Sequence, residues 1–473
     1  MLGLSLFALS APLSGCLAGA PPDAAALAEG VVVPAKAPSL TDEMPSPTGR
    51  FQTYSTTGSI DQTNAFFLSL GTNGRSCVTC HQPQDGWTIT PAHVQARFDA
   101  TTPKGTDPIF RTNDGSNSPT ADVSTETARR AAYSMLLTKG LIRVGIGIPT
   151  GADFTLVKID DPYGYAKPGE LSLFRRPLPS TNLGFLSTVM WDGRETFAET
   201  PINADLKDQS NGATLGHAQA TTGIDDATQT AIVGFESALY TAATYDNDAK
   251  ALTDKQGQGD PIDLSQVPFY LGINDSLLHD PGPGAPPFSP NVFTLYDNWL
   301  DSTGKTNGVD GARGAIARGM ILFNTKPISI TGVKGLNDNT TIGSPAVING
   351  SCSTCHDTPN AGNHSFPLPV DIGVADGSRR TSDLPLYTLH CNADPPEVTV
   401  TTTDPGRALI TGKCADIGKF KGPTLRALSA RAPYFHNGSA ASLDDVVSFY
   451  DTRFGIGLSA QERSDLVAFL RAL

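Results

Sequence analysis

Two short segments hold the residues with the clearest chemistry, and both have the pattern Cys-x-x-Cys-His. They are Cys77-Val78-Thr79-Cys80-His81 and Cys352-Ser353-Thr354-Cys355-His356. Two thiols at this spacing can form thioether bonds to the two vinyl groups of one porphyrin, and the histidine that follows can then ligate the iron. A zinc ribbon would need two more ligands at short spacing, and no other cysteine lies within thirty residues of either segment. The sequence therefore predicts two covalently bound haem c groups, one at each segment.

Three further cysteines lie outside these segments, at Cys16, Cys391 and Cys414. Haem attachment and a spare cysteine pair both indicate an oxidising, exported location. A disulfide between Cys391 and Cys414 would close the loop over residues 392–413, whereas the alternative is two free buried thiols. Exported proteins seldom keep neighbouring thiols apart, which favours the disulfide.

The composition narrows the class of protein further. The chain has 473 residues, a formal net charge of −13, 47 glycines and 36 prolines. The acidic balance argues against nucleic acid and an anionic membrane surface as partners. The many glycines and prolines favour long ordered loops around cofactors. No run of 18 or more apolar residues follows the first twenty positions, so no transmembrane helix is expected in the mature chain.

The first 48 residues have the composition of an export signal and a tether. Residues 2–15 are largely apolar, and Leu13-Ser14-Gly15-Cys16 resembles a bacterial lipobox, in which the cysteine is lipidated. An ordinary signal peptide with a chance cysteine is the alternative. Residues 17–48 are rich in alanine and proline, which is typical of a flexible tether. We therefore expect a periplasmic protein that contacts a membrane only through a lipid on Cys16.

Periodicity and capping residues place the remaining elements. We expect helices at 64–70, 124–139, 226–244, 313–323, 443–450 and after the capping box of Ser459 and Glu462, and strands at 141–148, 154–159 and 171–174. The predicted fold is mostly α, with two cytochrome-c-like haem domains and long loops. An N-terminal haem domain would cover 49–300, with a small β insertion at about 141–176, and a C-terminal haem domain would cover 301–473.

Three further motifs fall between and after the two haem segments. They are Trp191-Asp192-Gly193-Arg194, Phe420-Lys421-Gly422-Pro423-Thr424-Leu425-Arg426 and Ala432-Pro433-Tyr434-Phe435-His436-Asn437-Gly438. In this order, the motifs resemble those of the bacterial di-haem cytochrome c peroxidases and their MauG-type relatives, over roughly residues 50–473. The resemblance implies an oxidoreductase that reduces or uses hydrogen peroxide at the N-terminal haem, with electrons relayed by the C-terminal haem. The alternative is a non-catalytic di-haem electron-transfer cytochrome.

The resemblance also assigns roles around the first haem. Trp191 would carry electrons between the haems, although a buried tryptophan is more often a core residue. The peroxidases carry a glutamine and then a glutamate over the open haem face. Gln209 resembles the glutamine, but the glutamate position falls on or near Gln219, and an amide cannot shuttle a proton. His217 is the nominated acid–base group, because a neutral imidazole can do so. Alternatively, His217 caps a helix.

For the outer axial ligand of each haem iron, the sequence leaves more than one interpretation open. The methionine that the peroxidases use at the second haem is replaced here, and Tyr450 fits its position, as in the MauG type. Tyr450 could instead be a packing residue, with His364 or His390 as the ligand. At the first haem, His93 is a candidate for the second axial ligand. Its alternative is a solvent-facing histidine at a helix start after Pro91.

The resemblance implies partners and a further ion. It implies hydrogen peroxide as oxidant and either a small electron donor, a cytochrome c or a cupredoxin, or an oxidisable partner protein. It also allows a homodimer. The family pattern includes a calcium ion bound in part by backbone carbonyls near Pro433. The asparagine expected before the proline of segment 175–182 is an arginine here, so the sequence leaves calcium open.

Overall fold

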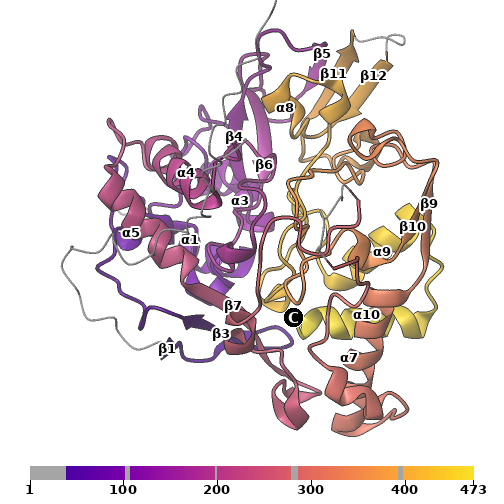
Figure 1. Cartoon of the computed structure of the whole chain (residues 1–473). Helices are drawn as coiled ribbons and strands as arrows, with labels where there is room; N and C mark the ends of the chain where they lie inside the picture. Colours follow the sequence, from indigo (N-terminus) through magenta and orange to yellow (C-terminus); the bar gives the residue numbers. More distant parts are fainter. Residues whose placement is uncertain (1–38, 102–106, 198–199, 278–285, 393–397) are drawn as a thin grey trace, which may run out of the picture. The chain divides into compact units, whose positions relative to one another are not determined.

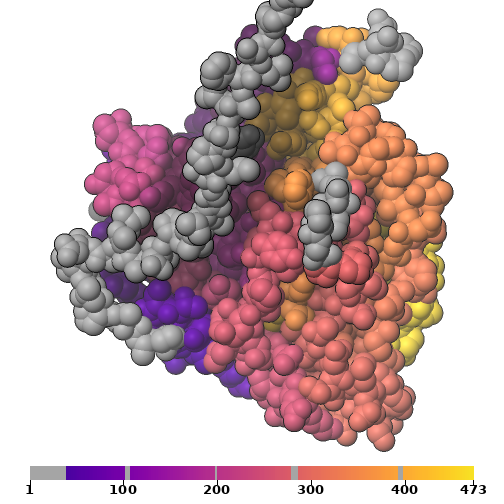
Figure 2. Space-filling model, viewed as in Figure 1, coloured from indigo at the N-terminus to yellow at the C-terminus, as the bar shows by residue number. Residues whose placement is uncertain are grey.

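A computed structural model describes residues 39–101, 107–197, 200–277, 286–392 and 398–473. The predicted signal, lipobox and most of the tether lie outside these residues. The chain from Ala37 onwards forms one compact unit. On the face shown in Figure 2, early residues of this unit (indigo to magenta) and late residues (orange to yellow) occupy different regions of the surface. In the described part of the chain, no helix combines the length and the apolar character needed to cross a membrane.

The helices are distributed along the whole unit (Figure 1). They are α1 (Pro91–Ala100), α2 (Glu126–Ala132), α3 (Ser134–Lys139), α4 (Ile202–Gly216), α5 (Asp226–Ser237), α6 (Pro261–Ser265), α7 (Gly308–Thr325), α8 (Ala408–Thr411), α9 (Leu443–Phe454) and α10 (Ala460–Arg471). The expected helices at 313–323, at 443–450 and after Ser459 are confirmed. The segment 64–70 forms only a short 3₁₀ turn at Ala65–Phe67, and the expected helix at 124–139 is divided at Tyr133 into α2 and α3.

The strands form small antiparallel sheets between these helices. They are β1 (Ser39–Leu40), β2 (Met44–Ser46), β3 (Gly49–Ser55), β4 (Ile142–Ile146), β5 (Phe154–Asp160), β6 (Leu171–Arg175), β7 (Leu239–Asp246), β8 (Lys250–Ala251), β9 (Ile328–Thr331), β10 (Val347–Gly350), β11 (Leu386–Cys391) and β12 (Val398–Thr402). In the described residues they make one five-stranded, one three-stranded and two two-stranded sheets. The fold thus combines helices with more β structure than the sequence led us to expect.

One expected helix is wrong in its second half. The segment 226–244 is helical only to Ser237, and the chain continues as β7, which pairs antiparallel with β3. β3 lies almost 190 residues before β7 in the sequence. In the paired strands Thr53 faces Thr241, and the two threonine hydroxyls are 2.9 Å apart. Pairing with this distant strand overrides the local helical pattern, because strand formation depends strongly on neighbouring strands.

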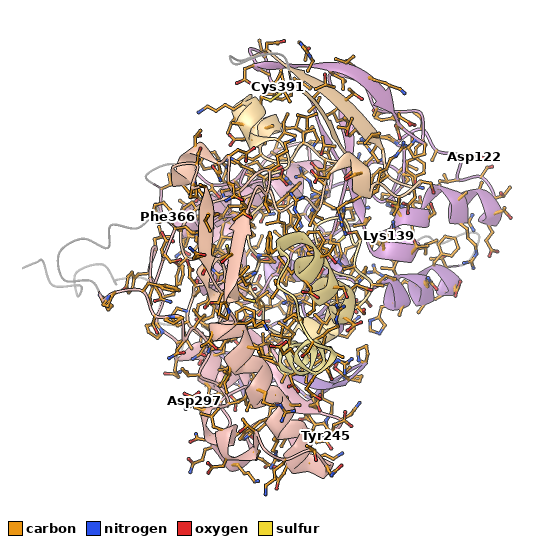
Figure 3. All side chains as sticks on the ribbon, turned by 90° about the vertical axis from the view of Figure 1, so that its right-hand side faces the viewer. Asp122, Lys139, Tyr245, Asp297, Phe366 and Cys391 are labelled. Atoms are coloured by element: carbon orange, nitrogen blue, oxygen red, sulfur yellow. A yellow bond between two sulfur atoms is a disulfide. The ribbon has the colours of Figure 1, made fainter. Side chains whose placement is uncertain are left out.

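The three short strands expected between 141 and 174 are confirmed as β4, β5 and β6, but they belong to two sheets. β4 pairs with β6, whereas β5 pairs with β11. Cys391 at the end of β11, labelled in Figure 3, forms the expected disulfide with Cys414. The disulfide therefore ties the end of β11 to the 3₁₀ helix at Cys414–Asp416.

The largest apolar core lies where α7 and α10 pack together. Met320 and Phe323 of α7 and Phe469 of α10 belong to this core, and the aromatic rings of Phe323 and Phe469 lie 5.7 Å apart. At Gly319 the helices approach so closely that a Cβ atom would lie 2.0 Å from the backbone oxygen of Asp465. Only glycine allows this contact, which brings α10 beside the second Cys-x-x-Cys-His segment.

Candidate functional site

Each Cys-x-x-Cys-His segment begins with a short 3₁₀ helix fixed by a serine and a threonine. In the first segment the backbone N–H of Ser76 donates to the hydroxyl of Thr79 (3.0 Å), and in the second Ser351 donates to Thr354 (3.0 Å). The backbone N–H of each following histidine donates to the carbonyl of the first cysteine. This shared Ser-Cys-x-Thr-Cys-His turn presents both cysteines and the histidine in the same way.

The first segment lines a cavity of about 170 Å³ with Cys77, Cys80 and His81. Neither cysteine forms a disulfide, and burial raises the pKa of both thiols above the ordinary value. The Nδ1–H of His81 donates to the backbone oxygen of Trp87 (3.1 Å), which leaves Nε2 available. Burial lowers the pKa of His81 to about 4, so the imidazole is neutral near pH 7, as an iron ligand must be.

The second segment repeats this arrangement around a cavity of about 240 Å³. Cys352 and Cys355 form no disulfide, and burial raises their pKa to about 12. The Nδ1 of His356 donates to the backbone oxygen of Gly362 (2.6 Å), and burial lowers the pKa of His356 to about 4. Two unpaired thiols and a neutral imidazole with one free nitrogen are the donors that c-type haem requires, so the residues of both cavities fit this group.

The outer ligand candidates of the second cavity can now be placed. Tyr450, on α9, lines the cavity, and burial raises the pKa of its phenol well above the ordinary value. His364 also lines it, but its Nδ1 lies 2.8 Å from Asp357 and its Nε2 3.8 Å from Asp275. His390 lies on β11 between β5 and β12, away from the residues that line the cavity.

The open side of the first cavity contains a histidine–aspartate pair. His217 follows α4, lines the cavity, and its Nδ1 donates to a carboxylate oxygen of Asp114. The other oxygen of Asp114 pairs with Arg75, which also lines the cavity. Burial by itself would raise the pKa of Asp114, but the hydrogen bond and charge of His217 and the charge of Arg75 bring it below the ordinary value. The carboxylate therefore stays ionised and orients the imidazole, which leaves Nε2 free.

The other residues nominated for the first haem divide into two groups. Gln209, on α4, lines the cavity. Gln219 is exposed and does not line it, because its backbone has a positive φ of 55° and its side chain bonds to Asn73. His93, at the start of α1, also lies off the cavity, where its Nδ1 pairs with buried Asp85 while the side chain stays half exposed.

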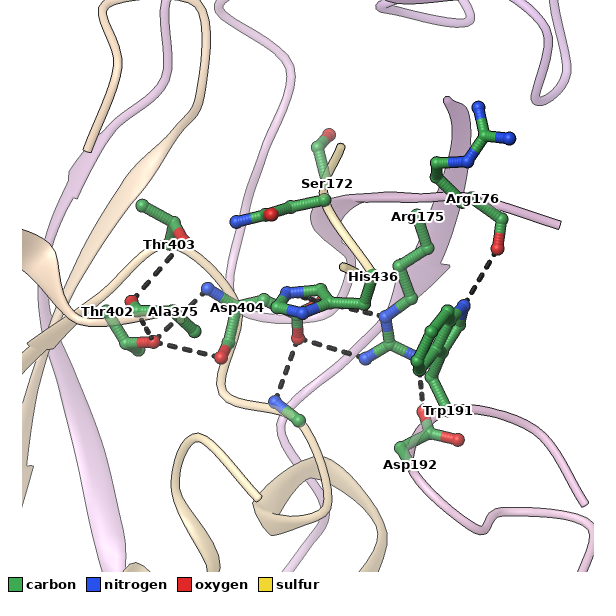
Figure 4. A network of polar contacts seen from close by, with 12 residues as sticks. Ser172, Arg175, Arg176, Trp191, Asp192, Ala375, Thr402, Thr403, Asp404 and His436 are labelled. Atoms are coloured by element: carbon green, nitrogen blue, oxygen red, sulfur yellow. Dashed lines mark hydrogen bonds and ion pairs between the residues drawn. The ribbon is translucent and has the colours of Figure 1, made fainter. Parts of the chain in front are cut away.

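Trp191 lies between the two cavities and lines both, as do Lys421 and Pro423. Its indole N–H donates to the backbone oxygen of Arg176 (2.8 Å), and its ring meets His436 edge to face at 6.2 Å (Figure 4). His436 lines the second cavity and stacks on Phe420 at 3.9 Å. An aromatic path thus runs from the first cavity to the second.

A buried ion network fixes the tryptophan loop. Arg175 pairs with Asp192, the residue after Trp191, and with both oxygens of Asp404 at 2.7 and 2.9 Å (Figure 4). Burial alone would raise the pKa of Asp192, but the charges of Arg175 and Arg194 lower it to about 2. Because Arg175 pairs with both Asp192 and Asp404, it ties the loop that carries Trp191 to the segment around Asp404.

Two buried ionisable residues at the cavities were not recognised in the sequence. Glu236 lines the first cavity, and burial raises its pKa to about 7. Burial lowers the pKa of Lys421 to about 7, and its Nζ donates to the backbone oxygen of Thr188 (2.7 Å). The one available signal for Glu236 was its place four residues after Ile232, on the apolar face of a helix.

The residues implied for calcium do not fit that ion. Arg176 stands where the family pattern expects asparagine, and its buried guanidinium donates to the backbone oxygens of Ile89 (2.7 Å), Lys139 (2.9 Å) and Arg431 (3.2 Å). Arg431 lies two residues before Pro433. The guanidinium therefore supplies the positive charge among the carbonyls of this region, and no calcium ligand set is formed there.

The two donor sets contain the residues that a c-type cytochrome requires. Comparison with known proteins finds relatives of a matching class. The cytochrome-c peroxidase IdrP1 of Pseudomonas sp. (strain SCT) is 34% identical over 148 residues, which are 27% of this chain and 38% of that protein. IdrP2 of Denitromonas iodatirespirans is 36% identical over 134 residues, 26% of this chain and 36% of that protein. Cytochrome c551 peroxidase of Nitrosomonas europaea is 43% identical over 72 residues, 14% of this chain and 21% of that protein.

The aligned region thus covers only a little more than a third of the length of the first two relatives. A crystal structure of a MauG-like protein associated with microbial copper homeostasis aligns over 87% of this chain and 86% of its own, with 17% identity and a TM-score of 0.39. No family model matches the chain. The sequence similarities therefore relate part of this chain to bacterial cytochrome c peroxidases.

Proposed function

We propose that this chain is a di-haem c-type cytochrome that reduces or uses hydrogen peroxide at its N-terminal haem, with electrons relayed by its C-terminal haem. The observation that carries the proposal is the difference between the two cavities. The first contains an imidazole oriented by a carboxylate, at His217 and Asp114, whereas the second contains Tyr450 on α9. This difference supports proton transfer by His217 at the first cavity and iron ligation by Tyr450 at the second.

The protein's own groups would divide the work in the following way. A haem held by Cys77, Cys80 and His81 would supply iron-centred redox chemistry for peroxide. His217 would take a proton from one peroxide oxygen at Nε2 and deliver it to the other. Asp114 holds the ring in the required tautomer by accepting from Nδ1. Complete reduction of peroxide to two waters consumes two electrons and two protons.

The electrons would cross between the cavities through Trp191. Its indole lines both cavities and is fixed by its hydrogen bond to Arg176 and by the network of Arg175. A small donor protein, a cytochrome c or a cupredoxin, would supply the electrons. Alternatively, an oxidisable partner protein would lose them, as the MauG-type members of the family imply. The net charge of −13 favours a partner with a basic docking face.

The cellular setting follows from the family and the cysteines. We place the protein in the periplasm, where haem attachment and the disulfide of Cys391 and Cys414 are both favoured. Anchoring through a lipid on Cys16, assembly as a homodimer and the division into haem domains at 49–300 and 301–473 remain parts of this proposal.

Stopped-flow spectroscopy tests the function. The purified protein, either fully oxidised or reduced by one electron equivalent per chain, is mixed with hydrogen peroxide, and the haem spectrum is followed with and without reduced cytochrome c. We expect a rapid peroxide-dependent spectral change and peroxide-dependent oxidation of the donor. If neither redox form reacts with peroxide while both haems still exchange electrons, the non-catalytic electron-transfer cytochrome is the correct description.

A further inference from the structure

The loop that follows the second Cys-x-x-Cys-His segment gathers polar side chains in the protein interior. Asp357, Thr358 and Ser365 have no exposed surface, and His364 is 5% exposed. The loop is closed by the backbone N–H of Thr358, which donates to Asn363 (3.1 Å), and by that of Ser365, which donates to a carboxylate oxygen of Asp357 (2.6 Å). These residues therefore face one another inside a rigid turn.

Many polar atoms of this loop have no hydrogen-bond partner. Six of the fifteen such buried side-chain atoms in the described residues lie between positions 357 and 365. They are Asp357 Oδ2, Thr358 Oγ1, Asn363 Oδ1, His364 Nδ1, His364 Nε2 and Ser365 Oγ. A buried polar group without a partner destabilises the folded state, so this concentration is unfavourable for the protein alone. All six atoms are buried in the protein, and one of the residues that carry them, His364, also lines the second cavity.

The geometry of the loop fits a shared cation better than a hydrogen-bonded pair. Asp357 Oδ2 lies 2.8 Å from His364 Nδ1, but neither atom has a partner in hydrogen-bonding direction. Asp275 Oδ1 lies 3.8 Å from His364 Nε2. One ligand atom from each of the three residues lies within 4.8 Å of the others. Two ligand atoms bound to one zinc at about 2.1 Å each are separated by about 3–3.5 Å, so small side-chain adjustments suffice.

The segment that carries Asp275 is already held against the loop. The side-chain amide of Asn274 donates to the backbone oxygen of Asp357 (3.2 Å). The backbone N–H of Gly272 donates to the backbone oxygen of Ser365 (3.0 Å). Asp275 is 2% exposed. Two carboxylates and one imidazole are thus fixed together in the interior.

We propose that Asp275, Asp357 and His364 bind one divalent cation, Zn²⁺ or Mn²⁺. One imidazole nitrogen combined with carboxylate and hydroxyl oxygens is a donor set for such ions. The ion neutralises the two carboxylates and ties the Gly272–Leu277 segment to the loop that begins at the proximal histidine of the second haem. It is a structural site beside the second cavity, separate from both haem irons and independent of the peroxide chemistry.

Metal analysis of the intact two-haem protein tests this site. The protein is expressed with both Zn²⁺ and Mn²⁺ in the medium and purified without chelator, and its metals are counted by mass spectrometry. We expect two irons and about one zinc or manganese per chain. The double variant Asp275→Asn/His364→Gln should keep two irons and lose the additional metal. The matched control His390→Gln changes a histidine outside both cavities and should retain it.

A second measurement does not depend on the variant folding. Wild-type protein is treated with a chelator, which leaves covalent haem in place, and its thermal unfolding is followed before and after one equivalent of Zn²⁺ or Mn²⁺ is added. A rise in the unfolding midpoint that saturates at one equivalent supports the site. The proposal is overturned if the wild type binds neither ion, or if the double variant retains as much metal as the His390→Gln control. The three side chains would then form an imidazole held between two carboxylates.

Discussion

Replacing His217 by alanine is the sharpest test of how the first cavity would work. The imidazole is the group in that cavity with a carboxylate on one nitrogen and the other nitrogen free. A general acid–base group typically contributes about 10²–10⁴-fold in rate. His217→Ala should therefore slow the reaction with peroxide by that factor, which corresponds to about 3–5 kcal/mol of activation free energy.

The structure also indicates that this variant should fold. Asp114 keeps its ion pair with Arg75, so the buried carboxylate loses one hydrogen bond and is not left unpaired. The expected loss in the free energy of unfolding is about 1–3 kcal/mol. Stopped-flow measurement of the peroxide reaction, with pyridine haemochrome analysis to confirm the haem content, gives the rate per intact protein.

His93→Ala is the matched control. His93 also pairs with a buried aspartate, Asp85, but it does not line the cavity, so its loss should leave the peroxide rate within about twofold of wild type. The reasoning fails if His217→Ala reacts as fast as His93→Ala. The proton would then pass through water or through Glu236, a buried carboxyl group that also lines this cavity and was not expected from sequence.

Four further outcomes are expected. Pyridine haemochrome analysis should give two haems per wild-type chain and one after substitution of Cys352 and Cys355 by alanine, and two haems in that variant would contradict the assignment. Trp191→Phe should keep both haems but slow electron transfer between them, measured by photoreduction, and an unchanged rate would exclude the indole from the path. Tyr450→Phe should change the spectrum of the second haem alone; a spectrum identical to wild type would leave this tyrosine a packing role. The pKa of Glu236 is raised from 4.5 to about 7 by burial, so its contribution to stability is fully present below pH 4.5 and is lost as the pH rises through 7. In the wild type, the free energy of unfolding measured with urea should therefore fall by about 3 kcal/mol between pH 5 and pH 8. Glu236→Gln should remove this fall. An equally large fall in the variant would assign the pH dependence to other groups.

Features that depend on neighbouring residues could be predicted from the sequence. The two Cys-x-x-Cys-His segments are contiguous, and their turns are closed by a serine and a threonine three positions apart, as at Ser76 and Thr79. The final helix follows the capping box of Ser459 and Glu462. The pair Cys391 and Cys414 was predictable because few alternatives remained once the haem cysteines were assigned. In each case the interaction acts over a short distance along the chain.

Only the tertiary structure decided which distant side chains meet. His217 and Asp114 are 103 positions apart, and nothing in either local sequence indicates their hydrogen bond. The same limit explains why Gln219, two residues after His217, turns away from the cavity while Glu236 enters it. The helix expected at 226–244 gave way to β7 because β3, from the start of the unit, pairs with it. Packing and strand pairing between remote segments depend on the position of the whole backbone, and local propensity does not determine that position.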